Sequence, residues 1–185
     1  MKEAVVFQKT DILRLAAICL FAGSVTGTVW ANGMGAELRE QIGAYTQVCI
    51  SGEYLGELGT EMLAEVFLRR ALAAAAGWLI GMTLLARPAI CVLAAGTGFS
   101  MAFLISCMTV QWGAGGLPVF VASLLPQWLL YVPVAAVLLS WAMAGQEKTH
   151  LPGFAVLLLL LFAGSVTELW FNPVVLQAII SICGI

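Results

Sequence analysis

Residues 151–173 read LPGFAVLLLLLFAGSVTELWFNP, and this stretch decides the fold that we expect for the whole chain. It carries no charge before Glu168. As a helix rising ~1.5 Å per residue, it is long enough to cross a hydrocarbon layer of ~30 Å. The stretch is therefore predicted to be a transmembrane helix that contains one acid.

The segment LFAGSVT of this helix occurs a second time, at residues 20–26 of the first apolar span. Both copies carry Gly and Ser, and such small residues let a neighbouring helix backbone approach closely in lipid. Shared helix-packing chemistry and chance repetition in a restricted alphabet both explain the identity. We expect helix-packing or partner-contact positions at Gly23, Gly27, Gly164, Ser165, Glu168, Asn172 and Pro173.

Glu168 and Asn172 lie four residues apart and share a helix face with Gly164. An acid at membrane depth costs a few kcal/mol, so Glu168 is expected to face protein or water rather than lipid. In the alternative interpretation, Glu168 lies about one turn from the outer end of its helix and reaches the headgroups.

The composition is that of an integral membrane protein with a single domain, residues 1–185. Only 10% of the residues are charged and 62% are hydrophobic, whereas charged residues make up ~25% of soluble domains. A net charge of −2 without a basic cluster argues against nucleic acid as a partner. The five cysteines show no CxxC spacing, so no metal or cofactor is expected, and pairing of Cys49 with Cys183 stays open.

Hydropathy predicts an all-α fold with about five transmembrane helices, near residues 12–32, 71–86, 89–110, 117–144 and 151–172. The first apolar run continues through Trp30, which favours a retained helix over a cleaved signal peptide. With the N-terminus in the cytoplasm, five Lys and Arg lie inside and three lie outside. A polar loop, residues 33–70, and the C-terminus are then external. The apolar tail, residues 174–185, is expected to lie in the interface or to fold against the bundle.

The external loop carries acids at a strict four-residue spacing, namely Glu53, Glu57, Glu61 and Glu65. Apolar residues fall on another side of the same segment, which predicts an amphipathic helix lying on the membrane. The acidic stripe is interpreted either as a solvated face or as a docking surface for a basic partner or a cation.

The fourth apolar block, residues 117–144, is interrupted by Pro118, Pro126 and Pro133. Proline removes a helix hydrogen bond, so residues 125–127 are predicted to separate a half-helix or re-entrant piece from the main span. Gln127 is expected to satisfy part of the freed backbone. Transporter sites are built from such broken helices, but ordinary kinked helices have the same sequence features.

Two motifs, SLLPQWLLYVP at residues 123–133 and ELWFNP at residues 168–173, resemble the stage II sporulation protein M family. In that family a Pro–Gln pair precedes an aromatic–x–Pro step in the fourth hydrophobic block, and an acid precedes a proline by five residues in the last. The positions that match these patterns are Pro126, Gln127, Tyr131, Pro133, Glu168 and Pro173. Trp128 departs from the polar residue expected after the Gln.

The resemblance implies a non-catalytic membrane scaffold of endospore formation. It would gather the stage II sporulation proteins D and P, which degrade cell wall, at the sporulation septum in the mother-cell membrane, for peptidoglycan remodelling during engulfment. The residues agree with a protein that is not an enzyme, because the single histidine, His150, has no evident partner for catalysis. The alternative is a small transporter or permease-like subunit with Glu168 lining a polar path, and homo-oligomers fit both functions.

Overall fold

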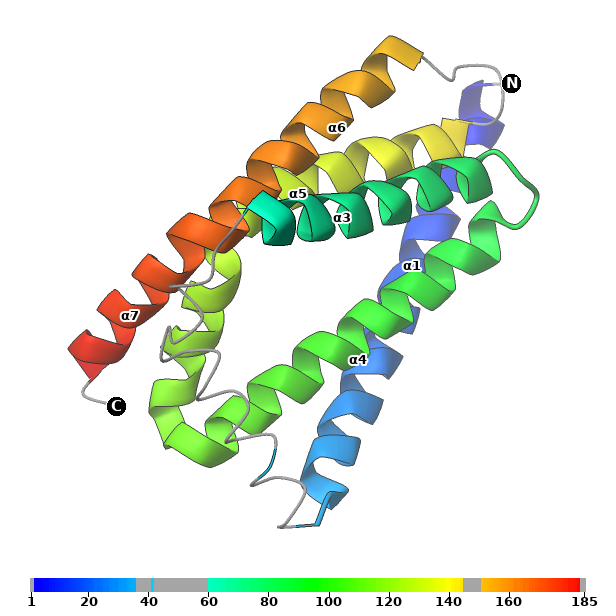
Figure 1. Ribbon diagram of the computed structural model, residues 1–185. Helices are drawn as coiled ribbons and strands as arrows, with labels where there is room; N and C mark the ends of the chain where they lie inside the picture. Colours follow the sequence, from blue (N-terminus) through cyan, green and yellow to red (C-terminus); the bar gives the residue numbers. More distant parts are fainter. Residues whose placement is uncertain (1, 36–40, 42–59, 145–150, 184–185) are drawn as a thin grey trace.

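The computed structural model describes residues 2–35, 41, 60–144 and 151–183, and every element in these ranges is helical (Figure 1). The all-α class is confirmed for this part of the chain. The elements in order are α1 (Lys2–Gly33), α3 (Thr60–Gly81), α4 (Ala86–Trp112), the short 3-10 helix η2 (Gly113–Gly115), α5 (Gly116–Ala144), α6 (Leu151–Val166), the π-helix η4 (Thr167–Phe171) and α7 (Asn172–Cys183).

Within the residues that the structure describes, three segments are long and apolar enough to cross a membrane: Asp11–Gly33, Ala86–Met143 and Pro152–Ile179. The second holds both α4 and α5, between which the chain turns at Gly113, a glycine with φ +57°. The helix α3 is not among the three, because Glu65, Arg69 and Arg70 interrupt its apolar character. Apolar length alone therefore identifies fewer spans than the five expected.

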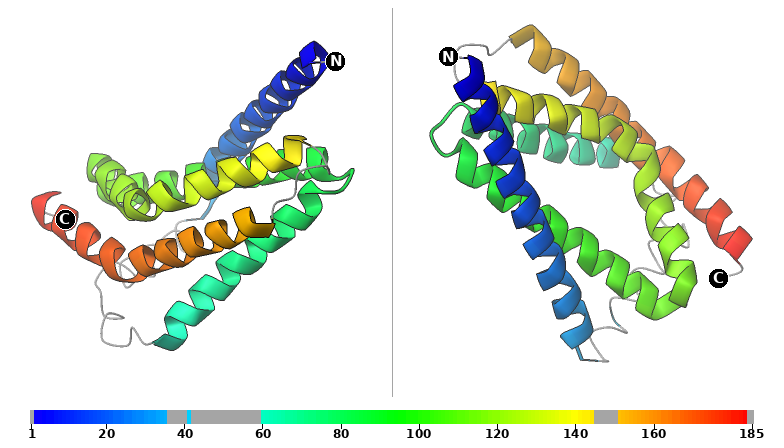
Figure 2. Two further views of the ribbon diagram at one scale, coloured as in Figure 1. Left: turned by 90° about the horizontal axis from the view of Figure 1, so that it is seen from above. Right: turned by 180° about the vertical axis from the view of Figure 1, so that it is seen from behind.

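Successive turns between the long helices lie at opposite ends of the molecule (Figures 1 and 2). The N-terminal end of α1, the turn from α3 to α4, the end of α5 and the start of α6 lie toward one end of the molecule. The turn from α4 to α5 and the end of α7 lie toward the opposite end. Consecutive long helices thus run back and forth.

The second helix differs from its predicted position at residues 71–86. It begins at Thr60, so the last part of the expected external loop is helical, and it ends at Gly81. Residues 82–85 form a turn in which Met82 N–H bonds Leu79 O at 3.1 Å. Pro88 lies in the first turn of α4, where its missing N–H costs no helix hydrogen bond.

The predicted break of the fourth block at residues 125–127 is wrong, because α5 is one helix with Pro126 and Pro133 inside it. The helix instead bends between its first and second halves (Figure 2). A proline that removes a hydrogen bond and crowds the preceding turn commonly bends a helix without ending it. The sequence identified the irregular position but not its form.

The last helix also continues beyond the predicted end at residue 172. It passes through η4 into α7, so that α6, η4 and α7 form one continuous helix, which bends between α6 and α7 (Figures 1 and 2). The tail folds against the bundle, one of the two expectations for it. Leu176 of α7 is buried in a cluster with Met108 of α4 and with Val119 and Ala122 of α5.

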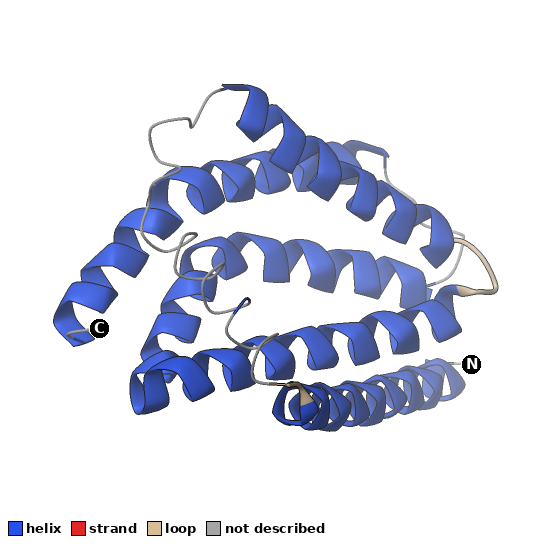
Figure 3. Ribbon diagram, turned by 60° about the horizontal axis from the view of Figure 1, so that its bottom comes forward, coloured by secondary structure: helices blue, strands red, loops and turns tan. Residues whose placement is uncertain are grey.

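The helices pack in two groups that α4 joins, because its Met108 is buried with residues of α5 and α7. The first is α1 with α4, the most extensively packed pair, in which α1 covers one edge of the molecule (Figure 3). The second is α3 with α5, α6 and α7, centred on a cluster of Ala74, Val134, Leu157 and Leu161. Many large apolar side chains point outward from both groups, which suits a surface that faces lipid.

Candidate functional site

Three helical elements bring three polar side chains together inside the second packing group. Arg70 of α3 forms an ion pair with Glu168 of η4, with Nη2 2.8 Å from Oε1. Tyr131 of α5 donates its hydroxyl to the other carboxylate oxygen, Oε2, at 2.7 Å. The Arg70 guanidinium also lies over the Tyr131 ring, 5.1 Å from its centroid. We call these three residues the polar triad.

The triad uses both oxygens of the only acid in the apolar segment Pro152–Ile179. Glu168 lies toward the middle of this segment rather than near its end, because the helix continues past Pro173. The interpretation in which Glu168 reaches the headgroups assumed that its helix ends about one turn later, and the helix does not end there. Its side chain is 23% exposed and that of Arg70 is 47% exposed, so the pair is partly shielded.

The π-helix positions Glu168. In η4 the N–H of Asn172 bonds the carbonyl of Thr167, five residues back, instead of four. Pro173 follows directly and has no N–H to give to the turn that holds Glu168 and Leu169. A single π turn inside an α-helix is rare and frequently marks a functional position. The turn that carries the acid is therefore irregular for a reason visible in the sequence.

Gly164 and Ser165 are the small residues of α6 that lie beside the triad, and Gly164 packs against the Tyr131 ring. A Cβ placed on Gly164 would lie 2.9 Å from Cδ1 of Tyr131, and closer still to Cε1, so the ring occupies the space that the glycine leaves. Ser165 is fully buried and donates its hydroxyl to Leu161 O at 2.9 Å. The small residues predicted for this helix face thus contact a side chain of α5.

Two amide oxygens on residues one helical turn from Tyr131 and Glu168 lack a hydrogen-bond partner. They are Oε1 of Gln127 on α5 and Oδ1 of Asn172 on α7, both of them buried atoms. Gln127 donates its Nε2 to Ser123 O at 3.2 Å, so this bond does not reach the carbonyl of Ala122, the one whose donor Pro126 removes. Pro133 lies further along α5, and it is exposed.

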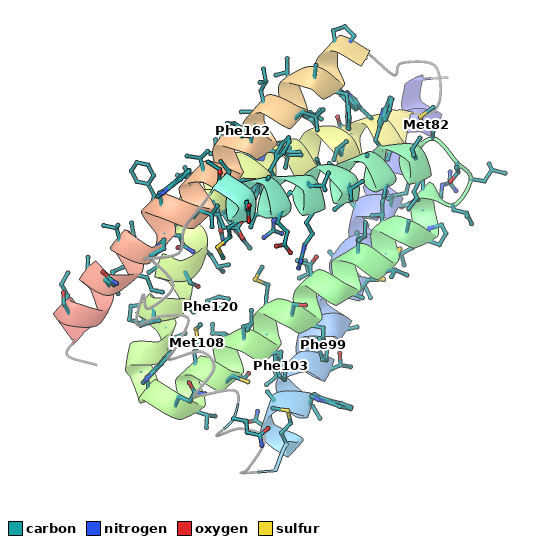
Figure 4. All side chains as sticks on the ribbon, viewed as in Figure 1. Met82, Phe99, Phe103, Met108, Phe120 and Phe162 are labelled. Carbon is teal, nitrogen blue, oxygen red and sulfur yellow. The ribbon has the colours of Figure 1, made fainter. Side chains whose placement is uncertain are left out.

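The first copy of LFAGSVT has a different neighbour. Gly23 and Gly27 lie directly against backbone atoms of Ala95 and Phe99 of α4, and Gly98 lies reciprocally against the carbonyl of Leu20. Figure 4 labels Phe99 and Phe103 of α4 beside this crossing, and their rings stack at 5.9 Å. We call this contact the glycine seam.

The two copies make the same internal hydrogen bonds. Ser24 and Ser165 each donate to the carbonyl four residues back at 2.9 Å. Thr26 and Thr167 each donate to the glycine carbonyl three residues back at 2.8 Å. The repeat therefore has one local conformation and serves two different packing contacts.

The acidic stripe is only partly within the described residues. Glu53 and Glu57 lie outside them, as do Cys49 and His150. Glu61 and Glu65 are exposed on the first turns of α3 rather than on a separate surface helix. Glu65 is paired with Arg69 at 2.7 Å, so the stripe ends in an ion pair.

Sequence reasoning did not assign Arg70 to the site. A signal was present, because an acid buried in an apolar helix requires a cationic partner, and α3 carries two arginines. Within the described residues, no group of three His, Cys, Asp or Glu side chains is placed to hold a metal ion. The triad is a closed set of charge-assisted hydrogen bonds and lacks an arranged nucleophile.

These features define a helical protein with apolar segments fit for a membrane and a polar triad between its helices. No family model, no curated protein and no solved structure matches the chain.

Proposed function

We propose that the chain is a non-catalytic membrane scaffold of endospore formation that recruits and anchors cell-wall hydrolases at the sporulation septum. The observation that supports this most is the hydrogen bond between Tyr131 and Glu168. It joins the two motifs on which the resemblance to the stage II sporulation protein M family rests. In this proposal the shared residues hold two helices in a fixed relation.

The chemistry of the triad fits such a static role. Both oxygens of Glu168 are engaged, one by a cation and one by a hydroxyl, and charge-assisted hydrogen bonds of this length are strong. An acid held in this way is poorly placed to accept a proton from a substrate. The scaffold would present external surfaces to the stage II sporulation proteins D and P from the mother-cell membrane, with its N-terminus in the cytoplasm and its C-terminus outside.

Affinity purification of the tagged chain from sporulating cells tests the scaffold. We expect the wall hydrolases to be recovered with the wild-type chain and with Gly96→Leu, which alters an open surface position of α4. Recovery should fall for Gly98→Leu, which disturbs the glycine seam. Absence of any hydrolase above background, in a detergent that preserves the fold, would contradict the proposal.

A transporter or permease-like subunit is the second candidate, and the bend of α5 beside a partly exposed acid favours it. It requires a water path to Glu168. In a cysteine-free background, Glu168→Cys should then react with a polar thiol reagent, whereas Leu159→Cys, at an outward-facing apolar position, should not. Equal lack of reaction at both positions would rule against the path.

A further inference from the structure

The oxygens left unpaired beside the triad are of one chemical kind. Gln127 Oε1 and Asn172 Oδ1 are both acceptors, and both are buried. The orientation of Gln127 is fixed, because its Nε2 donates to Ser123 O and a flipped amide would set two oxygens against each other. An unpaired acceptor at this position is satisfied by a hydrogen-bond donor or by a cation.

The packing register places the two oxygens at the same level. The helices α5 and α6–α7 run antiparallel (Figure 1), and Tyr131 meets Glu168 by a hydrogen bond. Ala122 and Leu176 belong to one buried cluster further along the same contact. Gln127 lies one helical turn from Tyr131, and Asn172 lies one turn from Leu176, so both fall between these two contacts.

Backbone carbonyls add to the same level. Pro126 cannot donate to the carbonyl of Ala122, a residue that is 0% exposed. Pro173 cannot donate to the turn that holds Glu168 and Leu169. Each of two prolines on facing helices thus removes the usual backbone donor of one carbonyl, on the helices that carry the two unpaired amide oxygens.

Glu168 supplies negative charge one turn away. Each carboxylate oxygen has a second lone pair beyond the one that Arg70 or Tyr131 uses. Neutral oxygens with a nearby carboxylate form the environment that hard cations take, and irregular transmembrane helices bind Na⁺ through such carbonyls. The two unpaired amide oxygens are acceptors, so they cannot themselves bind an anion.

We propose that α5 and α7 form a site for Na⁺, with Gln127 Oε1, Asn172 Oδ1 and the carbonyls freed by Pro126 and Pro173 as its oxygen ligands. The site does not depend on the scaffold function. The Arg70 guanidinium competes with the ion for the charge of Glu168, so removal of Arg70 strengthens Na⁺ binding.

Thermal unfolding of the full chain in lipid nanodiscs tests the site. We expect NaCl to raise Tm above its value in choline chloride at equal ionic strength, saturably, by about 3–5 °C at ten times the dissociation constant. Gln127→Leu and Asn172→Leu should each abolish the difference. Gln111→Leu is the matched control, because the unpaired atom of Gln111 is Nε2, a donor, and its Na⁺ response should persist.

Arg70→Gln gives a second readout of opposite sign. We expect it to lower Tm in choline and to move the half-saturating Na⁺ concentration at least threefold lower than in the wild type. Equal Tm values in NaCl and choline chloride for the wild type would overturn the proposal, since only water would then occupy the site. A Na⁺ response that survives in Gln127→Leu would also overturn it, and if that variant does not fold, the wild type and Arg70→Gln decide.

Discussion

The glycine seam between α1 and α4 and the polar triad between α3, α5 and η4 solve the same problem by opposite means. In the seam, Gly23, Gly27 and Gly98 remove side chains so that backbones touch, and dispersion and weak Cα–H contacts hold the helices. In the triad, three long side chains reach between helices and satisfy one another. Any side chain added to a seam glycine would push the two backbones apart and disrupt the whole contact. The triad, in contrast, can lose one hydrogen bond at a time.

The largest effect is expected from Gly98→Leu in the seam. A Cβ at this position would meet the carbonyl of Leu20, a backbone atom that cannot move aside alone. We expect a loss of about 3 kcal/mol or more in the free energy of unfolding, seen as a lower Tm in detergent. Gly96→Leu is the control, since nothing lies within 4 Å of a Cβ at Gly96. Equal losses in the two variants would show that the seam is not the cause.

The triad should give a smaller and divisible effect. Arg70→Met and Glu168→Leu each leave one charge without its partner, and we expect each to cost about 2 kcal/mol. The double variant should lose less than the sum, with a coupling of about 1 kcal/mol because both side chains are partly exposed. Denaturation of all four proteins measures this coupling. Additive losses would mean that the ion pair contributes nothing.

The smallest effect is expected from Gly164→Ala, which compares the small-residue contact of the polar triad with the glycine seam. Its Cβ meets the ring of Tyr131, a side chain that can rotate away, rather than a backbone atom. We expect a cost of about 1 kcal/mol, mainly from the lost hydrogen bond to Glu168. Tyr131→Phe should then add nothing further in the Gly164→Ala background. A full additional loss would show that the ring had stayed in place.

Several features followed from the sequence because local chemistry determines them. The helical class, the small-residue faces at Gly23 and Gly164 and the irregularity near Pro126 each follow from side chains a few residues apart. Element ends were less predictable. Helix α3 continues ahead of the apolar run because charged residues extend a helix as readily as apolar ones, and hydropathy does not register them.

The site was predicted on one side only. Glu168 and Tyr131 lie in the two motifs that the sequence analysis identified. Arg70 is 98 residues from Glu168, and its role depends on which face of α3 turns inward. The partner of a buried charge is a tertiary property. The requirement for such a partner was readable, but its identity was not.

The π turn in η4 determines which face of α7 packs against α5. One surplus residue between α6 and α7 offsets the phase of everything downstream by roughly 100° relative to an unbroken α-helix. Leu176 faces α5 only because of that offset. Closing Thr167–Phe171 into a regular α-helix with every residue kept would turn α7 by about a quarter of a circle and aim a different stripe of apolar side chains at its neighbour. Deleting one residue from the turn would instead restore regular winding and leave Leu176 facing α5.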